Sequence, residues 1–276
     1  MKALVAAAYG PLEQLRVHDV PDPSPGPGQV QVRVQAAALN PIDVKLVTGE
    51  LRAMFPVTHP FVPGVDATGV VAAVGEGVTR FAAGDEVIAY AGAASAMIAE
   101  YALVGEGPEL VHRPRALSPV HAAALPMAAM TAHCVLAAAL EPGDSALVIR
   151  ALGGARDHRP HRRRHPERGP AAAPRRAGCG RRPDQRRSRT RVPAGLVRPG
   201  GRLVSTLYSP AEVDGVAPVY VRMEASTGDL HRQAERVAAG RMSIEGAATY
   251  PLDEAPQATR DLAEGQYTRG KIVITF

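Results

Sequence analysis

Cysteine is nearly absent from this sequence of 276 residues, and its scarcity argues against a disulfide-stabilised fold and against a structural zinc site. The two cysteines, Cys134 and Cys179, stand far apart and form no C-x-x-C pair. A disulfide scaffold and a structural zinc site both need several closely spaced thiols, so neither fits this chain. Free thiols are typical of a reducing compartment, and we expect a cytoplasmic protein. The length suits one large domain or two ordinary ones.

The sequence also lacks a clear targeting or membrane segment. Residues 1–10 hold a short apolar run and one Lys but no small-residue cleavage site, so we predict a strand rather than a signal peptide. Residues 122–140 carry no formal charge, yet they are rich in Ala and include Pro126, Thr131 and His133. Buried helices explain this composition better than a membrane span, so we expect no membrane partner.

Residues 1–115 have the pattern of a β-rich domain. Residues 29–35 alternate polar and apolar side chains with a period of two, which is typical of a half-buried strand. Residues 70–74 and 86–90 are further apolar runs bounded by glycine. Many short strands separated by glycine turns predict a barrel or a sandwich.

Beyond residue 115 the pattern changes to helices. Ser118 is a candidate N-cap, and Thr131 is a candidate start for the next helix, with Gly143 beyond its end. Residues 229–240 and 253–265 place apolar side chains on one helical face, and residues 271–276 predict a closing strand.

Glycine is scarce where a nucleotide-binding turn would need it. Residues 145–149 are typical of a buried parallel strand. A dinucleotide fold then requires a glycine-rich turn and a helix whose N-terminus faces the pyrophosphate. The chain supplies only Gly153 and Gly154, flanked by Arg150 and Arg156. We therefore predict a damaged phosphate-binding turn.

The segment that follows is strongly basic. Residues 150–191 contain 15 Arg, no Lys and three acids, a net charge of +12, whereas the rest of the chain has 17 bases and 24 acids, a net charge of −7. Three interpretations compete: an arm that binds a polyanion, a solvated linker, and a stretch of GC-rich coding sequence read out of frame. We favour the third, because the segment begins abruptly at Arg150 and patterning resumes near Val192. We expect no stable structure across residues 155–190.

Eight short motifs occur in an order that resembles a known family. They are Asn40-Pro-Ile-Asp43, Val62-Pro-Gly-Val-Asp66, Gly84-Asp-Glu-Val87, Ala99-Glu-Tyr-Ala102, Ala122-Ala-Ala-Leu-Pro126, Pro142-Gly-Asp144, Arg198-Pro-Gly-Gly201 and Arg269-Gly-Lys-Ile-Val273. The chain resembles the zinc-free quinone oxidoreductase branch of the medium-chain dehydrogenase/reductase superfamily over residues 1–149 and 192–276.

The resemblance implies an α/β protein with a β-barrel. A GroES-like barrel domain would span residues 1–115, with a C-terminal return at 266–276. A Rossmann domain, truncated and disrupted at 150–191, would span 116–265. The resemblance also implies NADPH as cofactor, a small-molecule quinone or enone as substrate, and a homodimer.

The metal ligands of zinc-dependent relatives are missing. A catalytic zinc site of that kind would show a Cys and then a Gly-His-Glu, where this chain has Asn40 and Gly64-Val-Asp66. Without a Lewis acid an isolated ketone is a poor hydride acceptor. A quinone or enone needs less help, because its own conjugated carbonyl takes up the charge.

The candidate site residues combine this resemblance with residue chemistry. Asn40 and Asp43 are expected in a loop facing the cleft, with Asn40 near the nicotinamide and Lys45 beside the substrate entrance; Asn-Pro is equally a common turn signal. Tyr90 and Tyr101 are candidate proton donors, although barrel tyrosines are more often packing residues. The predicted catalytic set is Asn40, Asp43, Lys45 and Tyr90, and the predicted cofactor set is Asn40, Thr131, Gly153, Gly154 and Lys271.

Two functions from different classes remain. The first is NADPH-dependent, zinc-independent reduction of quinones or conjugated enones by hydride transfer. The second is a catalytically inactive, damaged relative in which only the barrel is intact. Nucleic-acid binding is disfavoured, because no aromatic side chain lies among the arginines of 150–191 to stack on bases.

Overall fold

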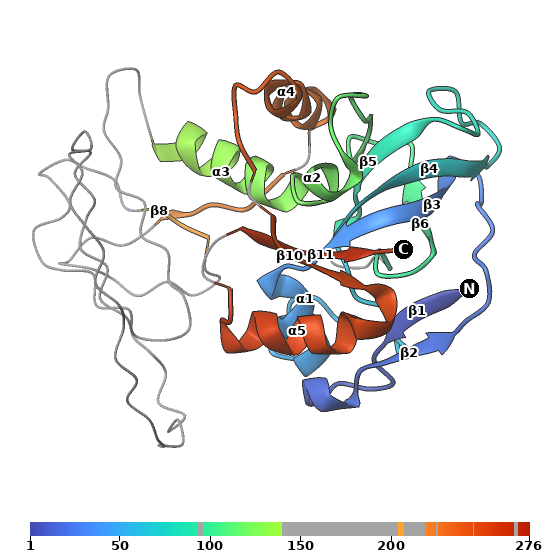
Figure 1. Ribbon diagram of the computed structural model, residues 1–276, viewed down its shortest axis with the longest axis vertical. Coiled ribbons are helices and arrows are strands. Elements are labelled where there is room, and N and C mark those ends of the chain that lie inside the picture. Colours follow the sequence, from blue (N-terminus) through green and yellow to red (C-terminus); the bar gives the residue numbers. More distant parts are fainter. Residues whose placement is uncertain (93–95, 140–203, 207–218, 225, 245, 268–269) are drawn as a thin grey trace, which may run out of the picture.

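The computed structural model describes residues 1–92, 96–139, 204–206, 219–224, 226–244, 246–267 and 270–276. Its main feature is a seven-stranded sheet (Figure 1). Its strands are β3 (Gln29–Ala38), β4 (Asp66–Val74), β5 (Glu86–Tyr90), β6 (Tyr101–Gly105), β7 (Leu110–His112), β10 (Gly246–Pro251) and β11 (Lys271–Thr275). A separate hairpin-like pair joins β1 (Lys2–Val5) to β2 (Arg16–Asp19), and β8 (Val204–Ser205) pairs with β9 (Val219–Tyr220).

β3 is the central strand, because it pairs with β4, β6 and β11. Its first residues alternate inward and outward, but Ala36, Ala37 and Ala38 are all buried. Small side chains are needed there, since both faces of this end of the strand are covered: Ala37 lies in the main core, while Ala36 and Ala38 contact Ala123 and Ala124 of the next helical layer.

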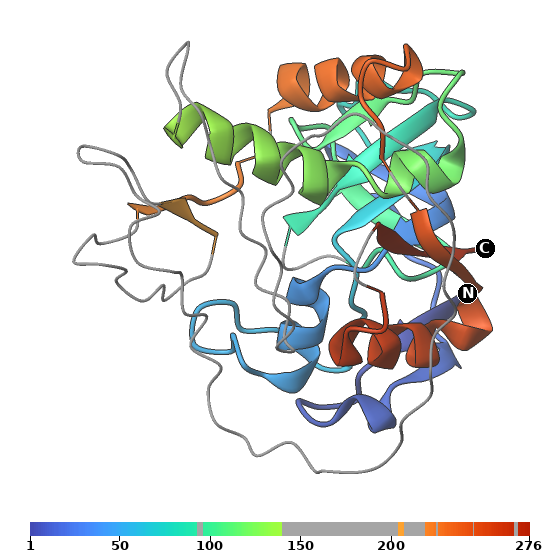
Figure 2. The same cartoon turned by 60° about the vertical axis from the view of Figure 1, so that its left-hand side comes forward.

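Helices cover the sheet in two groups (Figures 1 and 2). One group is α1 (Pro41–Thr48) with α5 (Ala255–Glu264), which follows the 3₁₀ turn Leu252–Glu254. The other is α2 (Pro119–Ala123), α3 (Pro126–Ala139) and α4 (Thr227–Ala238), of which α3 and α4 lie side by side. Among the described residues, no helix has the length and apolar character that a membrane crossing requires.

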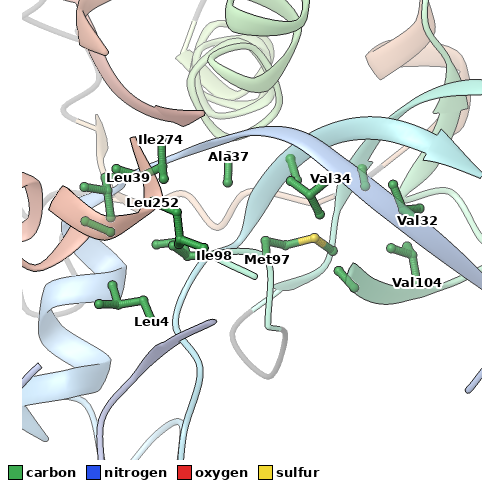
Figure 3. Close-up of a cluster of buried hydrophobic side chains, with 14 of the residues drawn as sticks. Leu4, Val32, Val34, Ala37, Leu39, Met97, Ile98, Val104, Leu252 and Ile274 are labelled. Carbon is green, nitrogen blue, oxygen red and sulfur yellow. The ribbon is translucent and has the colours of Figure 1, made fainter. Parts of the chain in front are cut away.

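The main core joins elements from both ends of the chain (Figure 3). Leu4 comes from β1, Val32 and Val34 from β3, Leu252 from the 3₁₀ turn and Ile274 from β11. These side chains lie together although their positions in the sequence are widely separated. The core therefore requires the C-terminal residues as much as the N-terminal ones.

Most of the predicted elements are confirmed. The strands predicted at 29–35, 70–74, 86–90 and 271–276 correspond to β3, β4, β5 and β11, and the helices predicted at 229–240 and 253–265 correspond to α4 and α5. Ser118 is the N-cap of α2, where its Oγ accepts from the His121 backbone N–H.

Two local predictions were wrong. Asp43 lies in helix α1 rather than in a loop, and Asn40 is the N-cap of that helix. Helix α3 begins at Pro126, so Thr131 lies in its second turn and does not start it. Proline at a first helical position is favourable, because it has no N–H to leave unpaired.

The C-terminal segment joins the sheet earlier than the expected return at residue 266. β10 pairs in parallel with β11, and β11 pairs antiparallel with β3. The domain boundaries themselves stay a prediction. The expectation of no stable structure across 155–190 concerns residues outside the described part of the chain.

Candidate functional site

Three of the predicted site residues meet in one buried polar cluster, which we define as Asn40, Asp43, Asp66 and Lys271. It lies where the end of β3, the start of β4 and the start of β11 come together beside α1. The two carboxyl side chains are fully buried, Asn40 is 2% exposed, and the Lys271 side chain is 15% exposed. Lys271 is therefore the member of the cluster that is reachable from solvent.

The amide of Asn40 is fully engaged in this cluster. Its Nδ2 donates to the Ala38 carbonyl at 3.2 Å and to Asp66 Oδ2 at 3.0 Å, and its Oδ1 accepts from the Lys271 ammonium. Both amide hydrogens are thus used within the protein. This arrangement accounts for Asn40 as a structural residue, and its contact with nicotinamide stays a prediction.

Asp43 connects two loops of the barrel. Its Oδ2 accepts from the backbone N–H of Asn40 at 2.7 Å, and its Oδ1 accepts from that of Gly64 at 3.2 Å. These bonds favour the charged carboxylate, but complete burial and the nearby Asp66 favour the neutral acid more strongly. Together they raise the pKa of Asp43 to about 7.

Asp66 holds the opposite side of the cluster. Its carboxylate accepts from the Met127 backbone N–H at 3.1 and 3.3 Å, and its Oδ2 lies 3.6 Å from the Lys271 Nζ. Burial raises the pKa of Asp66, while Lys271 and Asn40 oppose that rise. Asp66 was not among the predicted site residues. The motif Val62-Pro-Gly-Val-Asp66 contained it, but nothing in its neighbours revealed the distant partners.

Tyr90 and Thr131 are each related to Asp66, the first across the sheet and the second through Met127. Tyr90 is the β5 residue directly opposite Asp66 of β4, so the two side chains share one face of the sheet. Thr131 lies one helical turn after Met127, and its hydroxyl is directed to the Met127 sulfur at 3.6 Å.

The remaining predicted residues are elsewhere. Lys45, whose side chain is half-buried, pairs with exposed Glu50 at 3.0 Å and is not a member of the cluster. Tyr101 is opposite Arg33, five residues along β3 from Ala38 and thus about 16 Å away along the strand. Gly153 and Gly154 lie outside the described residues.

In the described ranges, no group of three or more His, Cys, Asp or Glu side chains is arranged to hold a metal ion. The cluster instead contains one ammonium, which lies beside the Asp66 carboxylate, and a second carboxyl group, that of Asp43. Of the residues predicted for the cofactor side, Lys271 carries an ammonium and Thr131 a hydroxyl, both of which are hydrogen-bond donors. Their contact with a nicotinamide stays a prediction.

Comparison with known proteins agrees with this fold. The alcohol dehydrogenase GroES-like domain family matches residues 26–113, and the zinc-binding dehydrogenase family matches residues 187–274. The second match begins close to Val192, where the pattern was expected to resume. Among solved structures, a quinone oxidoreductase from Coxiella burnetii covers 100% of this chain and 99% of its own, with a TM-score of 0.71 and 19% identity. A thermostable alcohol dehydrogenase from Pyrobaculum aerophilum has the same coverage, with a TM-score of 0.73 and 21% identity.

The class is therefore an α/β dehydrogenase with GroES-like and Rossmann-like domains. Over these two matched stretches the chain is similar to the medium-chain dehydrogenase/reductase superfamily. It is 39% identical over 138 residues to a chloroplastic quinone-oxidoreductase homolog of Spinacia oleracea, covering 49% of this chain and 42% of that protein. It is 35% identical over 163 residues to the chloroplastic NADPH-dependent alkenal/one oxidoreductase of Arabidopsis thaliana, covering 56% and 42%. The matched stretch spans less than half the length of either relative.

Proposed function

We propose that this chain derives from an NADPH-dependent, zinc-independent reductase of quinones or conjugated enones. The observation that carries the proposal is the composition of the buried cluster. Where a catalytic zinc site would have a Cys and a Gly-His-Glu, the chain has Asn40 and Gly64-Val-Asp66, and the positive charge there belongs to Lys271. A quinone-oxidoreductase homolog and an alkenal/one oxidoreductase among its relatives support the same substrate class.

The chemistry assigned to the chain's own residues is electrostatic. A bound nicotinamide would supply the hydride. When hydride reaches a conjugated acceptor, negative charge develops on the carbonyl oxygen, and a nearby donor stabilises it. Tyr90, on the same sheet face as Asp66, and Lys45, on α1, are the proposed donors. Lys271 and Thr131 are the proposed contacts on the cofactor side.

The second candidate is a catalytically inactive relative, and one sequence observation favours it. Of the glycines that a phosphate-binding turn needs after residue 149, only Gly153 and Gly154 are present. A side chain at the other positions obstructs the close approach of backbone to pyrophosphate. We propose that this chain, which lacks those glycines, binds NADPH much more weakly than relatives with an intact turn do.

A titration separates the two candidates. NADPH binding is measured by fluorescence at low and moderate salt, with ATP as the matched control, and quinone reduction is followed in the same samples. The inactive candidate predicts weak binding that collapses at moderate salt and does not distinguish NADPH from ATP, because the arginines act as a diffuse charge. Micromolar, salt-resistant, NADPH-selective binding with turnover would instead establish the reductase.

Three finer expectations remain proposals. They are the preference for NADPH over NADH, a homodimeric assembly and a cytoplasmic location. The two relatives described above are chloroplastic, so the location is best tested directly by fractionation.

A further inference from the structure

Asp66 is the shared acceptor of three donors from distant parts of the chain. Asn40 Nδ2 precedes α1, the Met127 N–H belongs to the first turn of α3, and the Lys271 ammonium belongs to the first residue of β11. The side chain of Asp66 is fully buried. A buried carboxylate must be satisfied by protein donors, so these three contacts are coupled to one another through Asp66.

Each contact has a structural purpose. The first N–H groups of a helix have no acceptor within the helix, and Asp66 supplies one for α3. A negative charge at that place is also favoured by the helix dipole. The same carboxylate lies beside the Lys271 ammonium and thereby restrains the long lysine side chain.

We propose that Asp66 is a positioning residue. It fixes the Lys271 ammonium and the first turn of α3, and it thereby places Lys271 and Thr131, the two side chains assigned to the cofactor side. Its role in cofactor binding rests on the proposed function, whereas its control of Lys271 and Met127 does not.

Asparagine at position 66 is the sharpest substitution. An amide has one acceptor oxygen, and its NH2 group would face at least one of the three donors that now meet the carboxylate. The shape of the side chain is preserved while the charge is lost. The matched control is Asp85→Asn, because Asp85 Oδ2 accepts from a backbone N–H, that of Ala82 at 2.9 Å, on an exposed turn.

The lysines provide a readout that needs no cofactor. The chain has only three: Lys2, paired with exposed Asp253; Lys45, paired with Glu50; and Lys271. In the unmodified protein, reductive methylation followed by mass spectrometry should label Lys271 most slowly. In Asp66→Asn, the labelling of Lys271 should rise about tenfold while that of Lys45 stays unchanged, and the Met127 amide should exchange about tenfold faster. Asp85→Asn should change neither.

A second variant covers the case in which Asp66→Asn does not fold, which would appear as rapid labelling of all three lysines. Lys271→Gln removes the cation but retains a polar end, and it should still speed Met127 exchange. Unchanged Met127 exchange in every folded variant, or fast labelling of Lys271 in the unmodified protein, would overturn the proposal. Where the unmodified protein turns over, Asp66→Asn should raise the KM for NADPH about tenfold with a smaller change in kcat. Absence of turnover would count against the proposed function alone, because labelling and exchange still decide the role of Asp66.

Discussion

At the candidate site, the four polar side chains of the buried cluster hold together segments that are far apart in the sequence. Asn40, Asp43, Asp66 and Lys271 satisfy one another, so none can be replaced without leaving another group unpaired. An unpaired buried donor or acceptor costs about 1–3 kcal/mol. The cluster therefore favours this one arrangement of the segments, apart from any part it has in catalysis.

Asp43 should make the stability of the protein depend on pH. Its pKa is about 7 in the folded protein, against about 4 in an unfolded chain. Between these values the folded state keeps a proton that the unfolded state loses, so the unfolding free energy falls as pH rises, by at most about 4 kcal/mol. The advantage of the unmodified protein over Asp43→Asn should therefore be largest near pH 4 and shrink toward pH 8. Urea unfolding across this range measures it, and a constant difference between the two proteins would contradict the assignment.

Among the elements, the strand pair β3–β4 has the strictest steric requirement. Gly69 of β4 lies opposite Val34 of β3, next to a register shift between Val34 and Ala36. A Cβ built at Gly69 would lie 2.1 Å from the Arg33 carbonyl oxygen. A backbone atom cannot move aside as the end of a flexible side chain can.

Gly69→Ala should consequently destabilise the protein by about 1–3 kcal/mol or more, because the two central strands must separate. Gly105→Ala in β6 is the matched control, since the nearest atom to its added Cβ lies 4.0 Å away. Thermal unfolding of both variants compares them. Equal stability of the two variants would show that β3 and β4 adapt to the extra methyl group.

Local pattern predicted most strands and helices, but it did not predict the junctions between them. The alternation at 29–35 is a property of adjacent residues, and it identified β3 directly. Helix α1 was missed because Asn40-Pro41 is equally a turn signal, and the contacts that stabilise the helix start come from Asp43 and Gly64. The sequence did not identify Asp66 as a site residue, because its partner Met127 is 61 residues away. A hydrogen bond between such distant residues leaves no pattern in the neighbouring sequence.

In the molecule as a whole, the C-terminal strand completes the structure that the N-terminal residues begin. β11 lies between β10 and β3, and Ile272, Val273 and Ile274 are almost completely buried. Its side chains enter the main core beside residues of β1 and β3 (Figure 3). The barrel and the C-terminal segment thus form one structural unit with a shared sheet and a shared core.

Ile274→Ala should destabilise this whole unit by about 2–5 kcal/mol, because it leaves a cavity in the main core. Phe276→Ala is the control two residues away, with a side chain that is 39% exposed. Chemical unfolding followed by circular dichroism and by hydrogen exchange of β3 should show the same loss for Ile274→Ala. If hydrogen exchange of β3 in Ile274→Ala equalled that of the unmodified protein, the sheet would fold independently of β11.

The position of β11 has a consequence for biosynthesis. It is the last of the described strands to be translated, yet it must enter the sheet between β10 and β3. Pairing between such distant segments requires closure of a long loop and is slow. Residues 36–38 of β3 must therefore wait for their partner strand until translation reaches Lys271–Thr275, whereas residues 29–33 can already pair with β6. A chain released before Lys271 is translated would leave this end of β3 as an open sheet edge, which is a site for aggregation.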